Sequence, residues 1–140
     1  MTPEEMKDRT KRFALRIVRL VAALPDNKVC FVMGRQLLRA GTSVGANYRA
    51  SCRARSAADF INKMGVVEEE CDEVLYWLDL LVESKQINPP DVSDLVKEGN
   101  QLLSILVASI RTARKNARTT PLSQRKSRQL QVNAEGAQND

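Results

Sequence analysis

The stretch SAADFINKMGVVEEECDEVLYWLDLLVESKQ, residues 56–86, predicts a long α-helix with one apolar side. Seven apolar residues recur in it at steps of three and four, the spacing that places side chains on one side of a helix: Phe60, Met64, Val67, Cys71, Val74, Leu78 and Leu81. Ser56 is a suitable N-cap, with Asp59 three residues on. The rest of the chain must supply helices that cover this apolar stripe.

Three further helices are predicted around this stretch, over residues 2–24, 28–54 and 90–117. The first opens on Thr-Pro-Glu-Glu and stops at Pro25-Asp26-Asn27, and the last opens at Asn88-Pro89-Pro90-Asp91. Proline suits the first turn of a helix and interrupts a helix elsewhere. Because the connections are short, neighbouring helices should be antiparallel. The expected fold is an all-α, up-and-down four-helix bundle over residues 1–117.

The segment AGTSVGA, residues 40–46, is unusual inside a predicted helix. Gly41 and Gly45 each cost about 1 kcal/mol relative to alanine there. We interpret both as structural residues that allow another helix backbone to approach closely; the alternative is a break or loop between them. Asn47, near the edge of the core-facing side, is expected to clamp a neighbouring helix backbone by a hydrogen bond, since a buried amide needs one.

Composition favours a helical protein that stays in the cytoplasm. Hydrophobic residues make up 43% of the chain but aromatic residues only 4%, which favours helices over a β-sandwich. The N-terminal residues are charged, and no segment reaches the roughly 18 apolar residues of a membrane span. Cys30, Cys52 and Cys71 are expected to be reduced and mostly buried. Residues 118–140 have few large apolar side chains and predict a flexible, basic and polar tail.

Charge is distributed unevenly along the chain. Residues 29–55 hold five arginines and no acid, whereas residues 56–90 hold two lysines against eight acids. At about 100° per residue, arginines line up on two helices: Arg9, Arg12, Arg16 and Arg19 on the first, and Arg35, Arg39, Arg49 and Arg53 on the second. Guanidinium groups pair with phosphate oxygens, so both stripes are candidate sites for RNA or DNA. The alternative is a solvated surface, or ion pairs with the acidic helix.

A candidate subunit contact lies on the 56–86 helix, away from its apolar stripe. Two apolar side chains, Tyr76 and Leu80, stand one turn apart among acids there. The candidate interface residues are Glu69, Asp72, Glu73, Tyr76 and Leu80. Since unlike surfaces that join head to tail can close a ring, this pattern predicts a homo-oligomer; ordinary surface residues are the alternative.

Residue content disfavours most enzyme classes. The chain has no histidine, the common general base and usual metal ligand. The run EEECDE at 68–73 lacks the Glu-x-x-His pairs of di-iron bundles, and GTSVG at 41–45 lacks the lysine of a phosphate loop. We therefore expect no catalytic residue, no metal and no cofactor.

A long and unusual combination of residues lies between positions 39 and 78: RAGTSVGANYRA (residues 39–50), Ala54-Arg55-Ser56, Asp59-Phe60, Lys63, Glu68-Glu69, Asp72-Glu73 and Trp77-Leu78. It resembles the four-helix-bundle proteins related to the 23S rRNA intervening-sequence protein, over about residues 10–115. The resemblance implies a bacterial homopentameric ring, encoded in some bacteria within insertions in ribosomal RNA genes. A more distant resemblance, to accessory proteins of diversity-generating retroelements, implies a basic pentameric barrel that binds nucleic acid and a reverse transcriptase.

Two functional hypotheses follow. In the first, an oligomeric ring presents arginines to RNA or DNA without reading sequence, since no base-reading motif is present. In the second, the arginines of the second helix are used in subunit contacts with the acidic helix. The protein is then an assembly scaffold for a protein partner, and nucleic acid is not bound.

Overall fold

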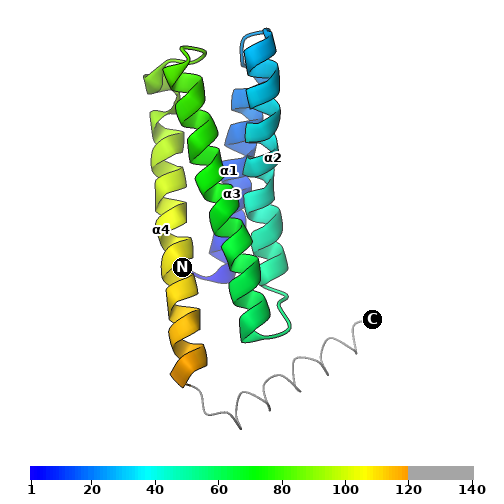
Figure 1. Ribbon diagram of the computed structural model, residues 1–140, viewed down its shortest axis with the longest axis vertical. Helices are drawn as coiled ribbons and strands as arrows, with labels where there is room; N and C mark the ends of the chain where they lie inside the picture. The colour runs from blue at the N-terminus through cyan, green and yellow to red at the C-terminus, as the bar shows by residue number, and fades with distance from the viewer. Residues whose placement is uncertain (120–140) are drawn as a thin grey trace, which may run out of the picture.

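The computed structural model describes residues 1–119, which form four α-helices and no strand. They are α1 (Pro3–Ala22), α2 (Lys28–Ser51), α3 (Ala57–Glu83) and α4 (Pro89–Thr119). Successive helices run in opposite directions in a single bundle (Figure 1). The most extensive contacts join α2 to α3, α3 to α4 and α1 to α2, while α1 and α4 touch less. The predicted all-α, antiparallel four-helix fold is confirmed.

Three helix starts carry the side-chain caps that their sequences provide. Thr2 Oγ1 accepts a hydrogen bond from the Glu5 backbone N–H at 3.1 Å, and the Glu5 carboxylate accepts one from the Thr2 N–H at 2.7 Å. This reciprocal pair is a capping box. Asn27 caps α2 and Ser56 caps α3, each accepting a hydrogen bond from the backbone N–H three residues on. These contacts fix where the helices begin.

Two predicted helix ends were too late in the chain. The predicted end at 54 is wrong because α2 stops at Ser51, which leaves Arg53 in the turn. The predicted end at 86 is wrong because α3 stops at Glu83. Lys85 adopts a left-handed φ of 64°, and the N–H groups of Lys85 and Gln86 return to the carbonyls of Val82 and Leu81. That arrangement is the common Schellman ending of a helix.

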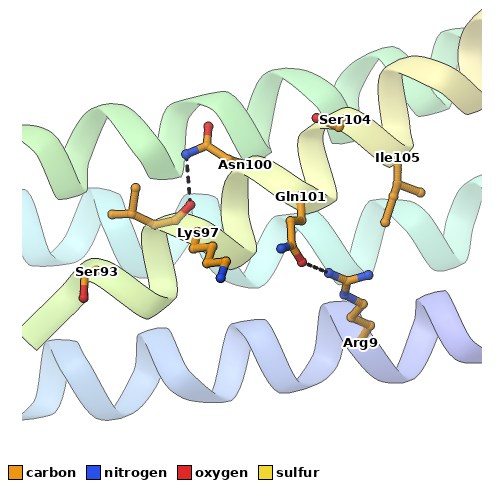
Figure 2. Close-up of a pocket in the computed structure, with 8 residues that line it drawn as sticks. Arg9, Ser93, Lys97, Asn100, Gln101, Ser104 and Ile105 are labelled. Carbon is orange, nitrogen blue, oxygen red and sulfur yellow. Dashed lines mark hydrogen bonds between the residues drawn. The ribbon is translucent and has the colours of Figure 1, made fainter.

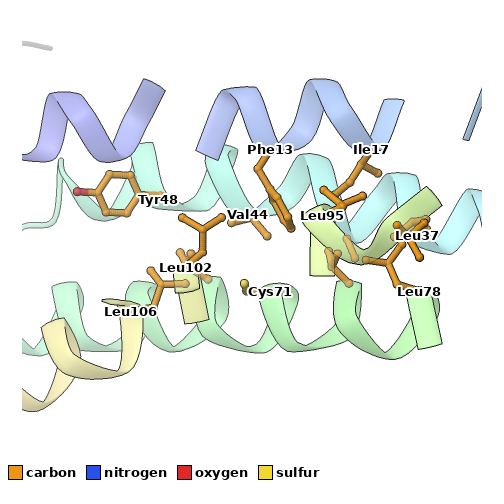
Figure 3. Packing of buried hydrophobic residues seen from close by; sticks show 14 of the residues in the cluster. Phe13, Ile17, Leu37, Val44, Tyr48, Cys71, Leu78, Leu95, Leu102 and Leu106 are labelled. Atoms are coloured by element: carbon orange, nitrogen blue, oxygen red, sulfur yellow. The ribbon is translucent and has the colours of Figure 1, made fainter. Parts of the chain in front are cut away.

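The core lies along the bundle axis, where apolar side chains of all four helices meet (Figure 3). Six of the seven stripe residues predicted on α3 are buried, and Phe60 is only partly covered. Cys30 and Cys71 are buried but Cys52 is exposed, so the burial expected for the cysteines fails at Cys52. Burial raises the pKa of the Cys71 thiol to about 12, with smaller contributions from nearby Asp72 and Glu98.

The two glycines inside α2 allow α1 to pack closely against it. A Cβ atom added at Gly41 would lie 2.5 Å from Ile17 Cδ1, and one at Gly45 would lie 3.2 Å from Thr10 Oγ1 and 3.5 Å from the Thr10 carbonyl carbon. The helix is continuous through both positions, so the alternative of a break there is wrong. The interpretation as close-approach sites agrees with these distances.

The last two turns of α4 extend past the buried core. Ile110 is the last buried residue, and the exposed cations Arg111, Arg114 and Lys115 follow it. Because α4 continues to Thr119, the predicted bundle boundary at 117 was two residues short. The rest of the predicted tail, residues 120–140, lies outside the described residues. Over residues 1–119 no helix combines the length and the apolar character needed to cross a membrane.

Candidate nucleic-acid interface

Arg9, the first arginine of the α1 stripe, binds α4 and does not face solvent freely. Its Nε donates to Glu98 Oε1 at 2.9 Å, and its Nη2 donates to Glu98 and to Gln101 Oε1 at 2.8 Å (Figure 2). The side chains of Arg9 and Glu98 are only 19% and 22% exposed. This pair connects α1 to α4 where the two helices have few other contacts. Arg9 therefore has a structural role, and its guanidinium donors are engaged by Glu98 and Gln101.

The other α1 arginines remain accessible. Arg12 forms a surface ion pair with Asp8 one turn earlier, at 2.9 Å, which contributes little stability because both side chains are largely exposed. Arg19 is exposed and Arg16 is half-buried. At about 100° per residue these three lie on the side of α1 that carries Arg9, toward α4. They do not continue the arginine surface of α2.

Arg39 on α2 forms ion pairs with two acidic residues of α3. Its guanidinium pairs with Glu70 at 3.1 Å and also with Glu73. The Glu73 carboxylate in turn accepts a hydrogen bond from the Trp77 indole N–H. Arg39 and Trp77 hold the pKa of Glu73 below its ordinary value. The alternative of ion pairs with the acidic helix is thus correct for Arg39, within one subunit.

The remaining arginines of the α2 stripe are exposed, and none of them forms an ion pair with another of the described residues. Lys28, in the first turn of α2, is likewise exposed and forms no ion pair with another of the described residues. We call these four residues the α2 basic face: Lys28, Arg35, Arg49 and Arg53. Residues 27–58 contain no acid. At 1.5 Å per residue, Arg35 and Arg49 are about 21 Å apart along the helix.

The predicted interface residues on α3 divide into two groups. Glu73 and Leu80 are partly covered, Glu73 by Arg39. The other three, Glu69, Asp72 and Tyr76, are exposed. With two further exposed acids of α3 they form what we call the α3 acidic face: Glu69, Asp72, Tyr76, Asp79 and Glu83. Tyr76 is 54% exposed and meets the Trp77 ring edge-on, with centroids 5.2 Å apart. An aromatic ring among four carboxylates is the one large apolar group on this face.

Asn47 does not have the role predicted for it. Its Nδ2 donates to the Ser43 carbonyl of its own helix at 2.8 Å. The predicted clamp to a neighbouring helix is therefore wrong, because the side chain satisfies its donor locally and is only partly buried.

The sequence patterns missed two features. Phe31 and Val32 are 65% and 54% exposed on α2, although apolar periodicity alone gives no reason to single them out. The cations at the end of α4, Arg111, Arg114 and Lys115, lie at the same end of the bundle as Arg49 and Arg53, because α2 and α4 run in the same direction (Figure 1). The absence of any acid in residues 99–119 was the available signal.

The described surface has open hollows between and along its helices. One lies along the outer side of α4 beside Arg9, among Ser93, Lys97, Asn100 and Ser104 (Figure 2). Within residues 1–119, no three His, Cys, Asp or Glu side chains are grouped to hold a metal ion. Guanidinium groups such as those of Arg35 and Arg49 pair with anions when they are exposed and not bound to an acid.

Comparison with known proteins places this geometry in a family. Residues 4–108 match the sequence profile of the 23S rRNA-intervening sequence protein family. The chain belongs to this family. This member of the 23S rRNA-intervening sequence family is also similar to a crystal structure, that of a protein of unknown function from the S23 ribosomal protein family of Bacteroides thetaiotaomicron VPI-5482. That protein is 37% identical, with a TM-score of 0.74 over 79% of this chain and 99% of the other. No curated protein matches the chain.

Proposed function

We propose that this member of the 23S rRNA-intervening sequence family is a non-enzymatic, cytoplasmic homo-oligomer that binds RNA or DNA without reading base sequence. The observation that carries the proposal is the α2 basic face. Its four cations are exposed, three of them on α2 and Arg53 in the turn that follows, and the surrounding segment 27–58 contains no acid. Like charges in a row are unfavourable alone and favourable beside a phosphate backbone, which releases its counterions when cations replace them.

Replacement of Arg35, Arg49 and Arg53 by alanine tests this proposal. Each lost phosphate contact should lower the slope of log affinity against log salt by about 0.7 to 0.9, so the triple variant should lose about 2 to 3 units of slope. Fluorescence anisotropy with a labelled RNA across a salt series measures it. A triple variant that binds like the wild type, with the same slope, would remove the α2 basic face from the function.

The Arg9→Ala variant is the matched control for the triple variant. It removes one arginine whose donors are already used by Glu98 and Gln101. We expect it to lower the free energy of unfolding by about 1 to 2 kcal/mol, because Glu98 loses a charged partner in a largely covered position. RNA affinity should change less than twofold.

Self-assembly is the second part of the proposal, and the exposed Tyr76 in the α3 acidic face supports it. A ring through this face would resemble the pentamers that the sequence resemblance implies. Tyr76→Asp should reduce the mass in solution to that of the 15.7 kDa monomer, because a fifth carboxylate would replace the apolar contact. Tyr76→Phe, which keeps the ring, should preserve the mass measured by light scattering. A wild-type protein that is itself monomeric would contradict this part.

The assembly-scaffold function is the competing candidate, favoured by the opposite charges of the α2 basic face and the α3 acidic face. It predicts a different result for the same triple arginine variant. If the α2 basic face contacts the α3 acidic face of another copy, the variant should lose mass and the wild type should show no salt-dependent RNA binding.

A further inference from the structure

Phe31 is an exposed aromatic residue at the start of α2. It is 65% exposed, with Val32 beside it at 54%, although most large apolar side chains of the bundle are covered. Most of the Phe31 side chain is therefore left uncovered by its own fold. Val29, 41% exposed, lies in the same part of α2, so the exposed apolar side chains of this helix are grouped at its start, which marks a candidate contact surface.

The surroundings of Phe31 are cationic and rich in hydrogen-bond donors. The Arg35 guanidinium carbon lies 5.6 Å from the centroid of the Phe31 ring, within the range of a cation–π contact. A shallow hollow beside the ring is lined by Phe31, Val32, Arg35, Gln36 and Arg39. Arg35 and Gln36 carry N–H donors, whereas Arg39 is already paired with Glu70 and Glu73. The local chemistry therefore combines a flat apolar ring with groups that bind phosphate and the polar edges of bases.

We propose that Phe31 is a stacking site for an unpaired nucleobase, so that the preferred partner is single-stranded nucleic acid. The proposal rests on the nucleic-acid binding proposed above and specifies its partner. An unpaired base can turn its flat surface onto the ring while Arg35 contacts the neighbouring phosphate. Bases inside a duplex are already stacked on one another and do not reach a ring on a helix surface. Proteins that bind single strands commonly combine a cationic track with such aromatic platforms.

Charge complementarity favours this occupant over a protein partner. The α2 basic face begins next to Phe31 at Lys28 and Arg35 and continues to Arg53, in the turn that follows the helix. A strand stacked on Phe31 would meet Arg35 beside the ring and, about 21 Å further along the helix, Arg49. Only Val32 extends the apolar surface in the hollow, which is little area for a protein contact.

The test compares Phe31→Ala with the wild type, using the full chain and a labelled RNA strand alone or annealed to its complement. Loss of one stacked base should weaken single-strand binding about 5- to 150-fold. Duplex binding should change less than twofold, and the salt slope should be unchanged because no cation is removed. Phe31→Trp should restore or increase single-strand affinity. Val32→Ala, which truncates a neighbouring exposed side chain without a ring, is the matched control and should have little effect.

Other outcomes overturn the proposal in distinguishable ways. Equal weakening of strand and duplex, or no weakening of either, would show that Phe31 does not stack on bases, while nucleic-acid binding itself stands. A fall in the solution mass of Phe31→Ala would assign the ring to a subunit contact instead. Failure of the wild type to bind either RNA would remove the proposed function and the stacking site together.

Discussion

Gly41→Ala should destabilise the protein by about 1 to 3 kcal/mol, although alanine is the better helix former by about 1 kcal/mol. The new Cβ would lie 2.5 Å from Ile17 Cδ1 and 2.9 Å from Ile17 Cγ2. Ile17 is fully buried and branched at Cβ, so it cannot move both methyl groups away in one rotation. Either α1 must shift away from α2 or Ile17 must leave its preferred rotamer. Chemical denaturation at equal protein concentrations measures the change.

Gly65→Ala provides the matched control for this prediction. Gly65 is also inside a helix, but a Cβ added there would meet nothing within 4 Å. The same substitution should therefore stabilise the protein by up to about 1 kcal/mol. Ile17→Val, which removes the nearest atom, should recover part of the loss in the Gly41→Ala background. If both glycine variants were stabilised alike, the tight α1–α2 approach at Gly41 would be refuted.

Much of the fold could be predicted because it depends on local patterns. Apolar residues recur on α3 at steps of three and four from Met64 to Leu81, which indicates a helix. An apolar stripe of this kind is stable in water only when other helices pack over it. The caps at Thr2 and Ser56 are similarly local, since each acts on a backbone N–H three residues on. The end of α3 was not predictable in the same way, because a lysine at position 85 gives no sign of a left-handed φ.

The candidate site was less predictable because it depends on which helices are neighbours. Angular position on α1 and α2 correctly grouped the arginines, but it gives no information about what lies across from each one. Arg9 and Arg39 reach Glu98 and Glu70, respectively 89 and 31 residues away in sequence. Only the packed bundle shows that these two arginines are used inside the subunit. Phe31 was missed because no other helix covers it, and the sequence pattern of α2 alone does not show which positions stay uncovered.

The salt dependence of RNA binding is the second large effect that we expect. Four phosphate contacts, one for each residue of the α2 basic face, give a slope of about −2.8 to −3.6 in log affinity against log salt. Between about 50 mM and 200 mM salt the affinity should then fall roughly 50- to 150-fold. A contact made mainly by apolar groups would change little over this range, because salt at these concentrations screens charges without weakening apolar burial.

The most direct test of the proposed function is this titration of the wild-type protein with a labelled RNA strand at several salt concentrations. We predict measurable binding at about 50 mM salt and the steep loss described above by about 200 mM. Binding that is absent at the lowest salt, or that is unchanged across the series, would contradict the account.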